Sequence, residues 1–580
     1  MFNKLIVVLI FLIMSLCTSG HAFTLTNWNE QEINSEEDIY KFYKEGLIEY
    51  FDYMYLLDIW ENKIDINKAA IEDLLDLPGI DAGVAESIIK YREKIGYFSK
   101  ISDLKKVPLL SKNIYRNIRN FINIYHFKKN GALKIKLEED PLDDEGFYVY
   151  HRLKYQTPLF GFGYLLERDQ EVDNYSLENG SPKKSEEENK FRLKKKYVLL
   201  KDFFGINNII IGDYTLRFGK GLVIGNFSSR NKIGALSDLS LYDKFFGTVL
   251  ELKMNCFTLT PFYSRDRLNN NGLSDVYQEE IKGLNAGFDV TEYFHLGGTY
   301  YRSEIEKDFN FNLNTYPDNN DAEVSGIDFF YRYGSLRFSG ETAKVKGKGG
   351  GKYLELYYDL KEILSLISFR DYAPDFYNPH SRSFAQEDDE PDDRDERGFY
   401  FESNFKFNKK FNIKTSFDQW AHAERKITDR ELKGQITCSP VSFLRLLLKH
   451  KVRDEDLSGT GDKKIKDYIS GRFSPWRKYE LDVFYGEDRD RNSDSEDIID
   501  NFWGYQVKSD NDKNIFLMRI KFSDDSTNIA GDKSKEYYFY AKIKKTKQIA
   551  LSFSFKAVHS SEDVFPNPEE IYRVICDYSW

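Results

Sequence analysis

Beyond its first residues, the sequence has no hydrophobic run long enough to cross a membrane as a helix. The one long apolar run, Leu5 to Leu16, follows Lys4 and precedes small residues at Gly20 and Ala22, a pattern typical of a secretory signal peptide. After Ala22 no run approaches the roughly 18 apolar residues of a spanning helix. We therefore expect an exported chain, which is either soluble or a β-barrel.

Cysteine is also scarce. Cys17 lies in the expected signal peptide, where the bulky Leu16 before it does not fit a lipoprotein signal, and Cys256, Cys438 and Cys576 are widely spaced without a CxxC motif. This pattern excludes a disulfide framework and a cysteine-based zinc site.

Catalytic motifs are missing too: the sequence contains neither HExxH nor GxSxG. We expect no catalytic residue, no metal site and no cofactor, so the chain is not expected to be an enzyme. His380, in a long polar stretch, is the one place to look for a catalytic group, and such a histidine is expected to be exposed and inert. The acidic run 387–396 is expected to be a solvated external loop tip rather than a cation site, because it lacks EF-hand spacing.

Aromatic residues, in contrast, are abundant. Tyr (40) and Phe (46) bring the aromatic content to 16%, although 31% of the residues are charged. Alternation of lipid-facing aromatic side chains with lumen-facing polar ones explains both values, so the composition favours a membrane barrel. The net charge of -11 disfavours binding of polyanions along the whole chain, and any nucleic-acid surface must be local.

Helical periodicity extends from residue 35 to about 129. Ser35 is expected to cap a helix over 36–51, and Asn67 one over 68–77. A third helix is expected over AGVAESIIKYREKI, residues 82–95, with Gly96 ending it, and a shorter pair over 102–107 and 111–122.

From about residue 131 the hydrophobic period changes to two, as in LKIKL (133–137) and ALSFSFKAV (550–558). The connections alternate in length. Tight ones are expected at 158–161, 204–207, 291–294, 407–411, 474–477 and 545–548. Long polar ones are expected at 170–193, 266–280, 306–321, 372–396, 453–464, 488–500 and 559–568. This alternation is typical of an outer-membrane barrel with short periplasmic turns, and the segments predict roughly 24 strands with both chain ends in the periplasm.

The last strand alternates and ends on an aromatic residue, with Tyr572, Val574, Cys576, Tyr578 and Trp580 on one face. It resembles the carboxy-terminal signal by which the outer-membrane assembly machinery recognises barrels, which implies that machinery as a partner during biogenesis.

Residues 64–118 resemble the tandem helix-hairpin-helix domain of the ComEA competence family. The resemblance rests on Asn67, Leu74, Leu77, Pro78, Gly79, Ile80, Ala85, Ile88, Tyr91, Arg92, Gly96, Phe98, Leu104 and Val107, among others. It implies binding of double-stranded DNA without sequence preference, through backbone N–H groups at a glycine turn and nearby cations. The candidate DNA-binding residues are Gly79, Ile80, Gly83, Lys105, Lys106, Lys112, Arg116 and Arg119.

The hairpins depart from the family pattern. Asp81 stands where the family has its second glycine, and the second hairpin, Pro108 to Ser111, has neither glycine. Charge favours the second half of the region: residues 61–89 hold seven acids and two bases, whereas residues 90–129 hold eleven bases and two acids. The basic half is suited to hold a polyanion. The alternative is a solvated helical face in a domain that contacts protein or plugs the barrel.

A second resemblance covers residues 207–238, which contain GDY and FGKGL. It is to large outer-membrane proteins of Bacteroidetes-type bacteria, which share the order of signal peptide, hairpins and barrel. Gly212, Gly219, Gly221 and Gly225 suggest tight backbone packing and a segment folded into the lumen. A phosphate-binding loop is disfavoured, because the GxxxxGK[ST] spacing is absent.

Together these patterns predict an α+β chain in two domains. The expected boundaries are a signal peptide at 1–22, a small all-α periplasmic domain at 23–129 with the hairpins at about 64–120, and a large transmembrane antiparallel β-barrel at 130–580. The leading hypothesis is a non-enzymatic barrel in the outer-membrane lipid of a Gram-negative bacterium, with DNA binding linked to DNA uptake. The alternative is a structural or transport barrel whose helical domain plugs the pore or binds protein.

Overall fold

The structure is a computed structural model. It describes residues 33, 38–39, 56–57, 59–60, 63–67, 69, 74, 77, 80, 82–124, 130–139, 148–157, 159–168, 175–178, 181–184, 191–225, 234–237, 245–270, 273–291, 293–307, 321–333, 335–360, 363–378, 380–381, 383–384, 395–408, 410–422, 427–441, 443–455, 457, 462–476, 479–491, 498–510, 514–525, 532–544, 549–560 and 569–579. The expected signal peptide and most of the helices expected at 36–51 and 68–77 lie outside these residues.

The described helical region contains the three later helices that the sequence predicts. They are α5 (Ala82–Ile95), the 3-10 helix η2 (Ile101–Lys106) and α6 (Lys112–Ile118). Gly96 has a φ of 82° directly after α5, a left-handed conformation that ends a helix most easily at glycine. A parallel pair of short strands, β1 (Ile64–Asp65) and β2 (Ile122–Asn123), joins the two ends of the region.

Asn67 has a role that the sequence does not predict. Its side chain accepts a hydrogen bond from Phe98 N at 2.7 Å and donates one to Phe98 O at 3.0 Å. This reciprocal pair engages both polar atoms of the amide side chain with the loop after α5. Sequence spacing alone does not show this tertiary contact, and most of the helix that Asn67 was expected to cap lies outside the described residues.

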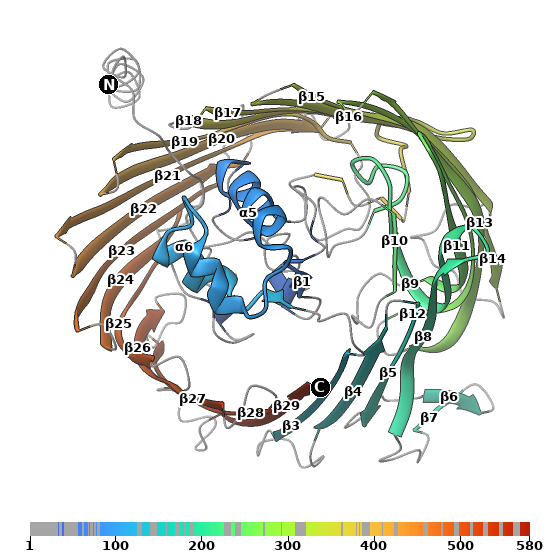
Figure 1. Ribbon diagram of the computed structural model, residues 1–580. Coiled ribbons are helices and arrows are strands. Elements are labelled where there is room, and N and C mark those ends of the chain that lie inside the picture. The colour runs from blue at the N-terminus through green and yellow to red at the C-terminus, as the bar shows by residue number, and fades with distance from the viewer. Residues whose placement is uncertain are drawn as a thin grey trace.

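Most of the described β-strands form a closed barrel (Figure 1). Its strands are β3 (Asn130–Glu139), β4 (Tyr148–Gln156), β5 (Phe160–Arg168), β8 (Phe191–Phe203), β9 (Ile206–Arg217), β11 (Phe245–Met254), β12 (Phe257–Asn270), β13 (Leu273–Thr291), β14 (Phe294–Lys307), β15 (Asp321–Tyr333), β16 (Leu336–Val345), β17 (Gly350–Leu360), β18 (Ile363–Tyr372), β19 (Arg397–Asn408), β20 (Phe411–His422), β21 (Ile427–Val441), β22 (Leu444–Asp454), β23 (Lys463–Trp476), β24 (Tyr479–Arg491), β25 (Ile498–Asp510), β26 (Asn514–Asp525), β27 (Asp532–Lys544), β28 (Ile549–Ser560) and β29 (Glu569–Ser579). Antiparallel pairing of β29 with β3 closes the ring, and β9 pairs with β11. The antiparallel barrel of about 24 strands that the sequence predicts is confirmed.

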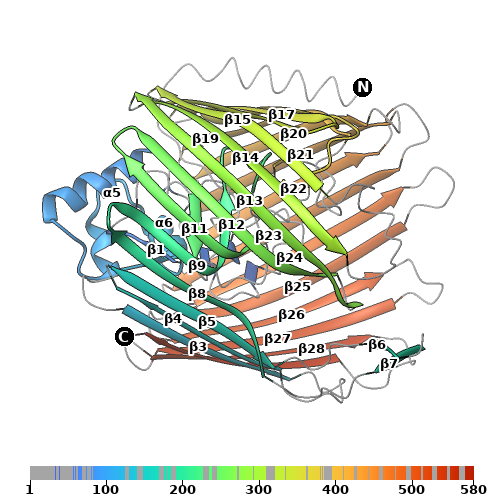
Figure 2. The ribbon, with the colours of Figure 1, turned by 90° about the vertical axis from the view of Figure 1, so that its right-hand side faces the viewer.

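Three further described strands lie outside this ring. The short strand β10 (Gly234–Ser237) pairs with the end of β9, and β6 (Tyr175–Glu178) and β7 (Ser181–Lys184) form a separate hairpin. Figure 2 shows the β6–β7 hairpin at one end of the barrel, with α5 and α6 at the other end.

The connections alternate in length as expected. All six tight turns predicted from the sequence join consecutive barrel strands, among them 204–205 between β8 and β9 and 545–548 between β27 and β28. One predicted long loop, 266–280, is wrong: β12 extends to Asn270 and β13 begins at Leu273, with Arg267 paired to Gln278. Polar sequence cannot distinguish a loop from a strand that continues beyond the apolar band, because both face water.

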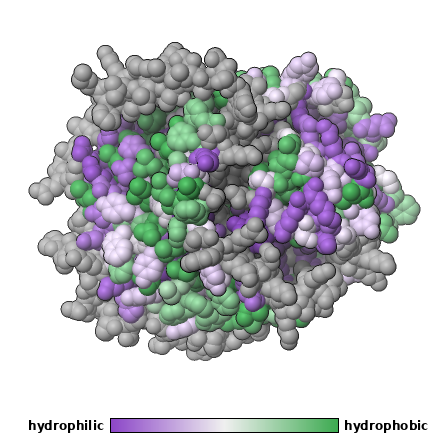
Figure 3. Space-filling view, turned by 60° about the vertical axis from the view of Figure 1, so that its left-hand side comes forward, coloured by the Kyte–Doolittle hydropathy of each residue, from purple (hydrophilic) through white to green (hydrophobic). Residues whose placement is uncertain are grey.

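Side chains on the barrel strands alternate between an outer face and the lumen. In β28, Leu551 and Phe553 are exposed on the outside, whereas Ser552 and Ser554 are buried. Large exposed hydrophobic side chains recur around the ring, as a surface that faces lipid requires. Figure 3 shows one flank, where hydrophobic residues (green) gather in a band with hydrophilic residues (purple) beside it.

Among the described helices, none is both long and apolar enough to span a membrane.

Candidate nucleic-acid interface and its setting

The buried residues of the two hairpins follow a repeat of 30 positions. Residues 30 positions apart occupy matching buried places in one hydrophobic core; the buried pairs are Leu74 and Leu104, Leu77 and Val107, Ile80 and Leu110, Ala85 and Tyr115, and Ile88 and Ile118. The hydroxyl of Ser87 in α5 donates to Pro108 O at 2.6 Å and joins the first repeat to the second. This arrangement is the tandem hairpin that the sequence predicts.

The candidate residues of the first hairpin have unequal access to solvent. Gly79 lies outside the described residues. Ile80 is 6% exposed and packs in the core, so its side chain is not positioned to contact DNA. Gly83 is exposed in the first turn of α5. Ile80 fits the family motif because it packs in the core. A motif alone does not distinguish a core residue from a DNA-binding residue.

The turn of the second hairpin contains a left-handed residue that is not glycine. Leu109, which is equivalent to Gly79, has a φ of 67°, and its side chain is 72% exposed. A left-handed conformation strains a residue with a Cβ by about 1–2 kcal/mol. Ser111 then caps α6, its hydroxyl accepting a hydrogen bond from Ile114 N at 3.2 Å.

Three of the candidate cations are exposed beside this hairpin: Lys105, Lys106 and Lys112. Lys105 Nζ lies 4.7 Å from the centre of the Tyr115 ring, and Lys106 Nζ lies 3.2 Å from Asp103 Oδ1. Hydrogen bonding from Ser99 and the nearby lysines hold the pKa of Asp103 below its usual range, against the opposing effect of desolvation. Lys100 N also donates to Asp103, which orders the turn that carries the lysines.

The remaining candidate cations, Arg116 and Arg119, are less exposed than the three lysines. Arg116 Nη1 is 3.8 Å from Glu480 Oε1 on β24, so this side chain faces the barrel wall. Arg119 is only partly exposed. A second contact with the wall is made by Lys542 of β27, whose Nζ lies 5.9 Å from the Trp60 ring centre. The helical domain therefore sits in one mouth of the barrel (Figures 1 and 2).

A second feature of the lumen is a plug made of two loops, 218–225 and the described part of 373–384. In the first loop, Phe218, Leu222, Val223 and Ile224 are at most 1% exposed. The backbone N–H groups of Lys220, Leu222 and Val223 donate to the carboxylate of Glu341 on β16, at 2.6, 3.0 and 2.9 Å. The GKG loop is thus an anion-binding turn already occupied by a protein carboxylate.

Of the segment expected at 207–238 to fold into the lumen, the loop 218–225 does so, whereas residues 207–217 belong to the barrel strand β9. Gly219 has a φ of 55°, and a Cβ there would lie 2.7 Å from Asp328 Cβ on β15, so only glycine fits. Lys220 Nζ adds an ion pair of 2.8 Å with Glu355 on β17. No sequence pattern identifies Glu341 or Glu355 as partners, because they are more than 100 residues away in the chain.

The second plug loop corrects the expectation for His380. Its Nε2 lies 2.9 Å from Glu279 Oε1 on β13, and its ring packs against Phe245 and Tyr301. Asn378 donates to both Leu222 O and Val223 O and ties the two loops together. His380 is therefore a packed lumenal residue rather than an exposed loop histidine.

The acidic run 387–396 lies outside the described residues except at its end, where Glu396 also differs from expectation. Glu396 is 1% exposed and forms an ion pair with Arg370, which also binds Asp418 at 3.0 Å. Glu396 therefore points into the barrel rather than to solvent. Within the described part of the chain, no three His, Cys, Asp or Glu side chains are grouped as metal ligands.

In comparisons with known proteins, sequence similarity is found in the hairpin region. Residues 61–123 match the family model described as "Helix-hairpin-helix motif". ComE operon protein 1 of Bacillus subtilis (strain 168) is 34% identical over 61 residues, which are 10% of this chain and 30% of that protein. Endonuclease/exonuclease/phosphatase family domain-containing protein 1 of Danio rerio is 45% identical over 47 residues, 8% of each chain. The chain thus spans less than a tenth of this last relative, and the similarity is confined to the hairpins.

Solved structures resemble the barrel. The copper transporter OprC superposes with a TM-score of 0.41 and 10% identity, over 79% of this chain and 82% of that one. The translocation pore of the P pilus usher PapC superposes with a TM-score of 0.36 and 8% identity, over 78% of this chain and 99% of that one.

Proposed function

We propose that this chain is a non-enzymatic outer-membrane barrel whose helix-hairpin-helix domain binds duplex DNA without sequence preference at the periplasmic mouth, as part of DNA uptake. One observation carries the proposal. The exposed lysines Lys105, Lys106 and Lys112 lie beside a hairpin turn, on a domain that Arg116 joins to the barrel wall.

The chemistry of this face suits a phosphate backbone. Ammonium groups contact phosphates as point charges, and an exposed turn lets backbone N–H groups approach them. The similarity to ComE operon protein 1 over the hairpins agrees with this reading. The substitution of Leu109 for glycine and the engagement of Arg116 with Glu480 both predict weak binding.

The test uses the full chain in lipid nanodiscs and a fluorescent 20-base-pair duplex, titrated across a salt series. The triple variant Lys105→Ala, Lys106→Ala, Lys112→Ala is expected to bind more weakly at every salt concentration. The slope of log K against log salt should become shallower by about 3, since each phosphate contact contributes about 0.9.

A matched control replaces three exposed barrel lysines with alanine: Lys282, Lys346 and Lys466. This control has the same change of net charge and should leave the slope unchanged. Equal behaviour of both triple variants, or no binding by the unaltered chain at low salt, would contradict DNA binding by this face.

A second candidate function is closure of the pore by the helical domain. The contacts of Arg116 with Glu480 and of Trp60 with Lys542 favour it, because they tie the domain to β24 and β27, two nearby strands of the barrel wall. Arg116→Glu would place two carboxylates together and should raise the single-channel conductance in planar bilayers. Restoration of the original conductance by adding Glu480→Arg would identify this pair as the latch.

A further inference from the structure

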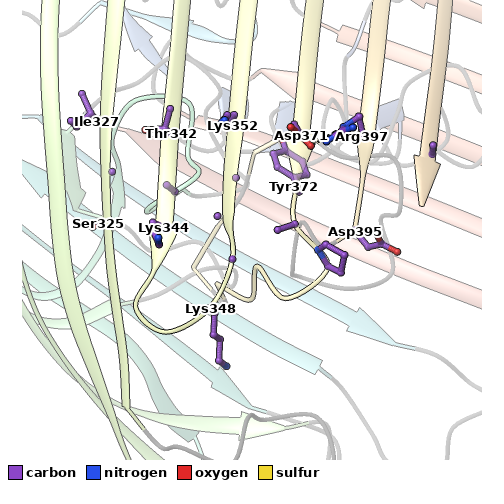
Figure 4. A pocket seen from close by; sticks show the side chains of 18 residues that line it. Ser325, Ile327, Thr342, Lys344, Lys348, Lys352, Asp371, Tyr372, Asp395 and Arg397 are labelled. Carbon is purple, nitrogen blue, oxygen red and sulfur yellow. Dashed lines mark hydrogen bonds and ion pairs between the residues drawn. The ribbon is translucent and has the colours of Figure 1, made fainter. Parts of the chain in front are cut away.

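The outer face of strands β15 to β20 carries a hollow of about 980 Å³. Figure 4 views these strands with the opposite wall of the barrel behind them. The glycines at 349–351 form part of its lining and leave it without side chains there. The hollow lies where β16 and β17 join through the connection 346–349, at the end of the barrel opposite the helical domain.

One level of the hollow is a row of side chains in register across six strands. The backbone pairings are Ile327 with Thr342, Thr342 with Lys352, Lys352 with Asp371, Asp371 with Arg397 and Arg397 with Ala421. Side chains opposite one another on the same face lie about 5 Å apart at their Cβ atoms, so the four residues between Ile327 and Ala421 form a continuous polar ledge. Arg397 Nε contacts Asp371 Oδ1 at 2.9 Å.

The ledge lies at the edge of the lipid-facing surface. Two residues further from the rim on the same outer face are Leu354, Phe369 and Phe399, which are 40%, 41% and 44% exposed. Their neighbours Tyr353 and Arg370 face the lumen and are buried. The outer surface therefore changes from apolar to cationic over two residues along each strand. Such a change is expected at the level where lipid acyl chains end and headgroups begin.

The hollow has an excess of positive charge. Its lining includes Lys344, Lys348, Lys352 and Arg397 against Asp371 and Asp395. Within the described part of the chain, no ion pair is present for Lys344 or Lys352, and both are exposed. Other outward cations do form ion pairs: Lys282 on β13 pairs with Glu280 at 2.9 Å, and Arg302 on β14 pairs with Glu304 at 3.0 Å.

We propose that this hollow binds the phosphorylated headgroup of a lipid in the outer leaflet, with Lys344 and Lys352 as the principal phosphate contacts. The ledge supplies cations at headgroup level, the glycines leave room for the headgroup, and the apolar side chains below receive the acyl chains. The site faces away from the lumen and is independent of the proposed DNA binding.

The test measures retention of bisphosphorylated lipid A by the full chain in neutral detergent, with native mass spectrometry as the readout. Lys344→Ala with Lys352→Ala should weaken binding at least tenfold, because each lysine near an anionic surface contributes about a factor of five. Lys344→Arg with Lys352→Arg should retain it. The control, Lys282→Ala with Arg302→Ala, removes two outward cations and should change binding less than twofold.

Two comparisons identify the source of the phosphate and protect the test against misfolding. Inorganic phosphate at equal concentration should compete poorly; competition equal to that of lipid A would overturn the lipid assignment. Dephosphorylated lipid A should bind the unaltered chain at least tenfold more weakly, a result that needs no variant. Equal affinity for both lipids, or unchanged binding by the double alanine variant, would overturn the proposal.

Discussion

The contact between Glu341 and the first plug loop makes the sharpest prediction about the lumen. Glu341 is 3% exposed, and its carboxylate accepts from three backbone N–H groups, those of Lys220, Leu222 and Val223. Glu341→Ala leaves all three donors buried without this acceptor. Each buried unsatisfied donor costs about 1–3 kcal/mol, so the plug loop should lose at least about 3 kcal/mol of local stability.

The measurement is hydrogen–deuterium exchange of peptides covering 218–225 in the full chain. A loss of about 3 kcal/mol corresponds to exchange faster by roughly two orders of magnitude when local opening limits it. Glu341→Gln should show a smaller effect, since its amide retains one oxygen but places an N–H group against the donors.

The control for this prediction is Glu304→Gln, which removes an exposed outward carboxylate paired with Arg302. It should leave exchange in 218–225 unchanged. If Glu341→Ala also leaves this exchange unchanged, the carboxylate does not hold the loop and the reasoning from unsatisfied donors is wrong. If exchange rises, the same variant should show a larger or noisier bilayer conductance, because the plug loop then opens.

Three further predictions concern other contacts. Leu109→Gly should slow amide exchange in α6 relative to Leu109→Ala by several-fold, because only glycine relieves the strain at a φ of 67°; equal exchange would contradict that strain. Arg370→Met should lower the stability of the barrel by about 3–5 kcal/mol in urea unfolding, since it leaves the buried Glu396 and Asp418 without their cation; a Met variant as stable as the parent would show that these acids find other partners. The interactions that lower the pKa of Asp103 stabilise the η2 turn fully above about pH 4, and this stabilisation should be lost as the pH falls through the folded-state pKa. Amide exchange near 100–106, corrected for intrinsic rates, should therefore depend on pH below 4. Asp103→Asn should abolish this dependence.

The elements of the chain were largely predictable, because local rules decide them. The helix at 82–95 is bounded by Gly96, and the strands follow a period of two that LKIKL and ALSFSFKAV display directly. The incorrect prediction of a loop at 266–280 shows where such rules fail, because the polarity of a segment indicates contact with water and not its backbone conformation. Lys105, Lys106 and Lys112 could be found from their charge, whereas the burial of Ile80 could not be separated from binding by motif alone.

The sequence by itself determined the two-part organisation, the closed antiparallel barrel and the basic half of the hairpin region. These follow from periodicity, turn residues and charge, which act over a few residues along the chain. Only the tertiary structure decided what each charge meets: Arg116 meets Glu480, Glu341 receives the GKG loop, Arg370 joins Glu396 and Asp418, and Lys352 stands in a row with Arg397. Such pairings depend on strand register and barrel closure, which bring together residues far apart in the chain and leave no local pattern in it.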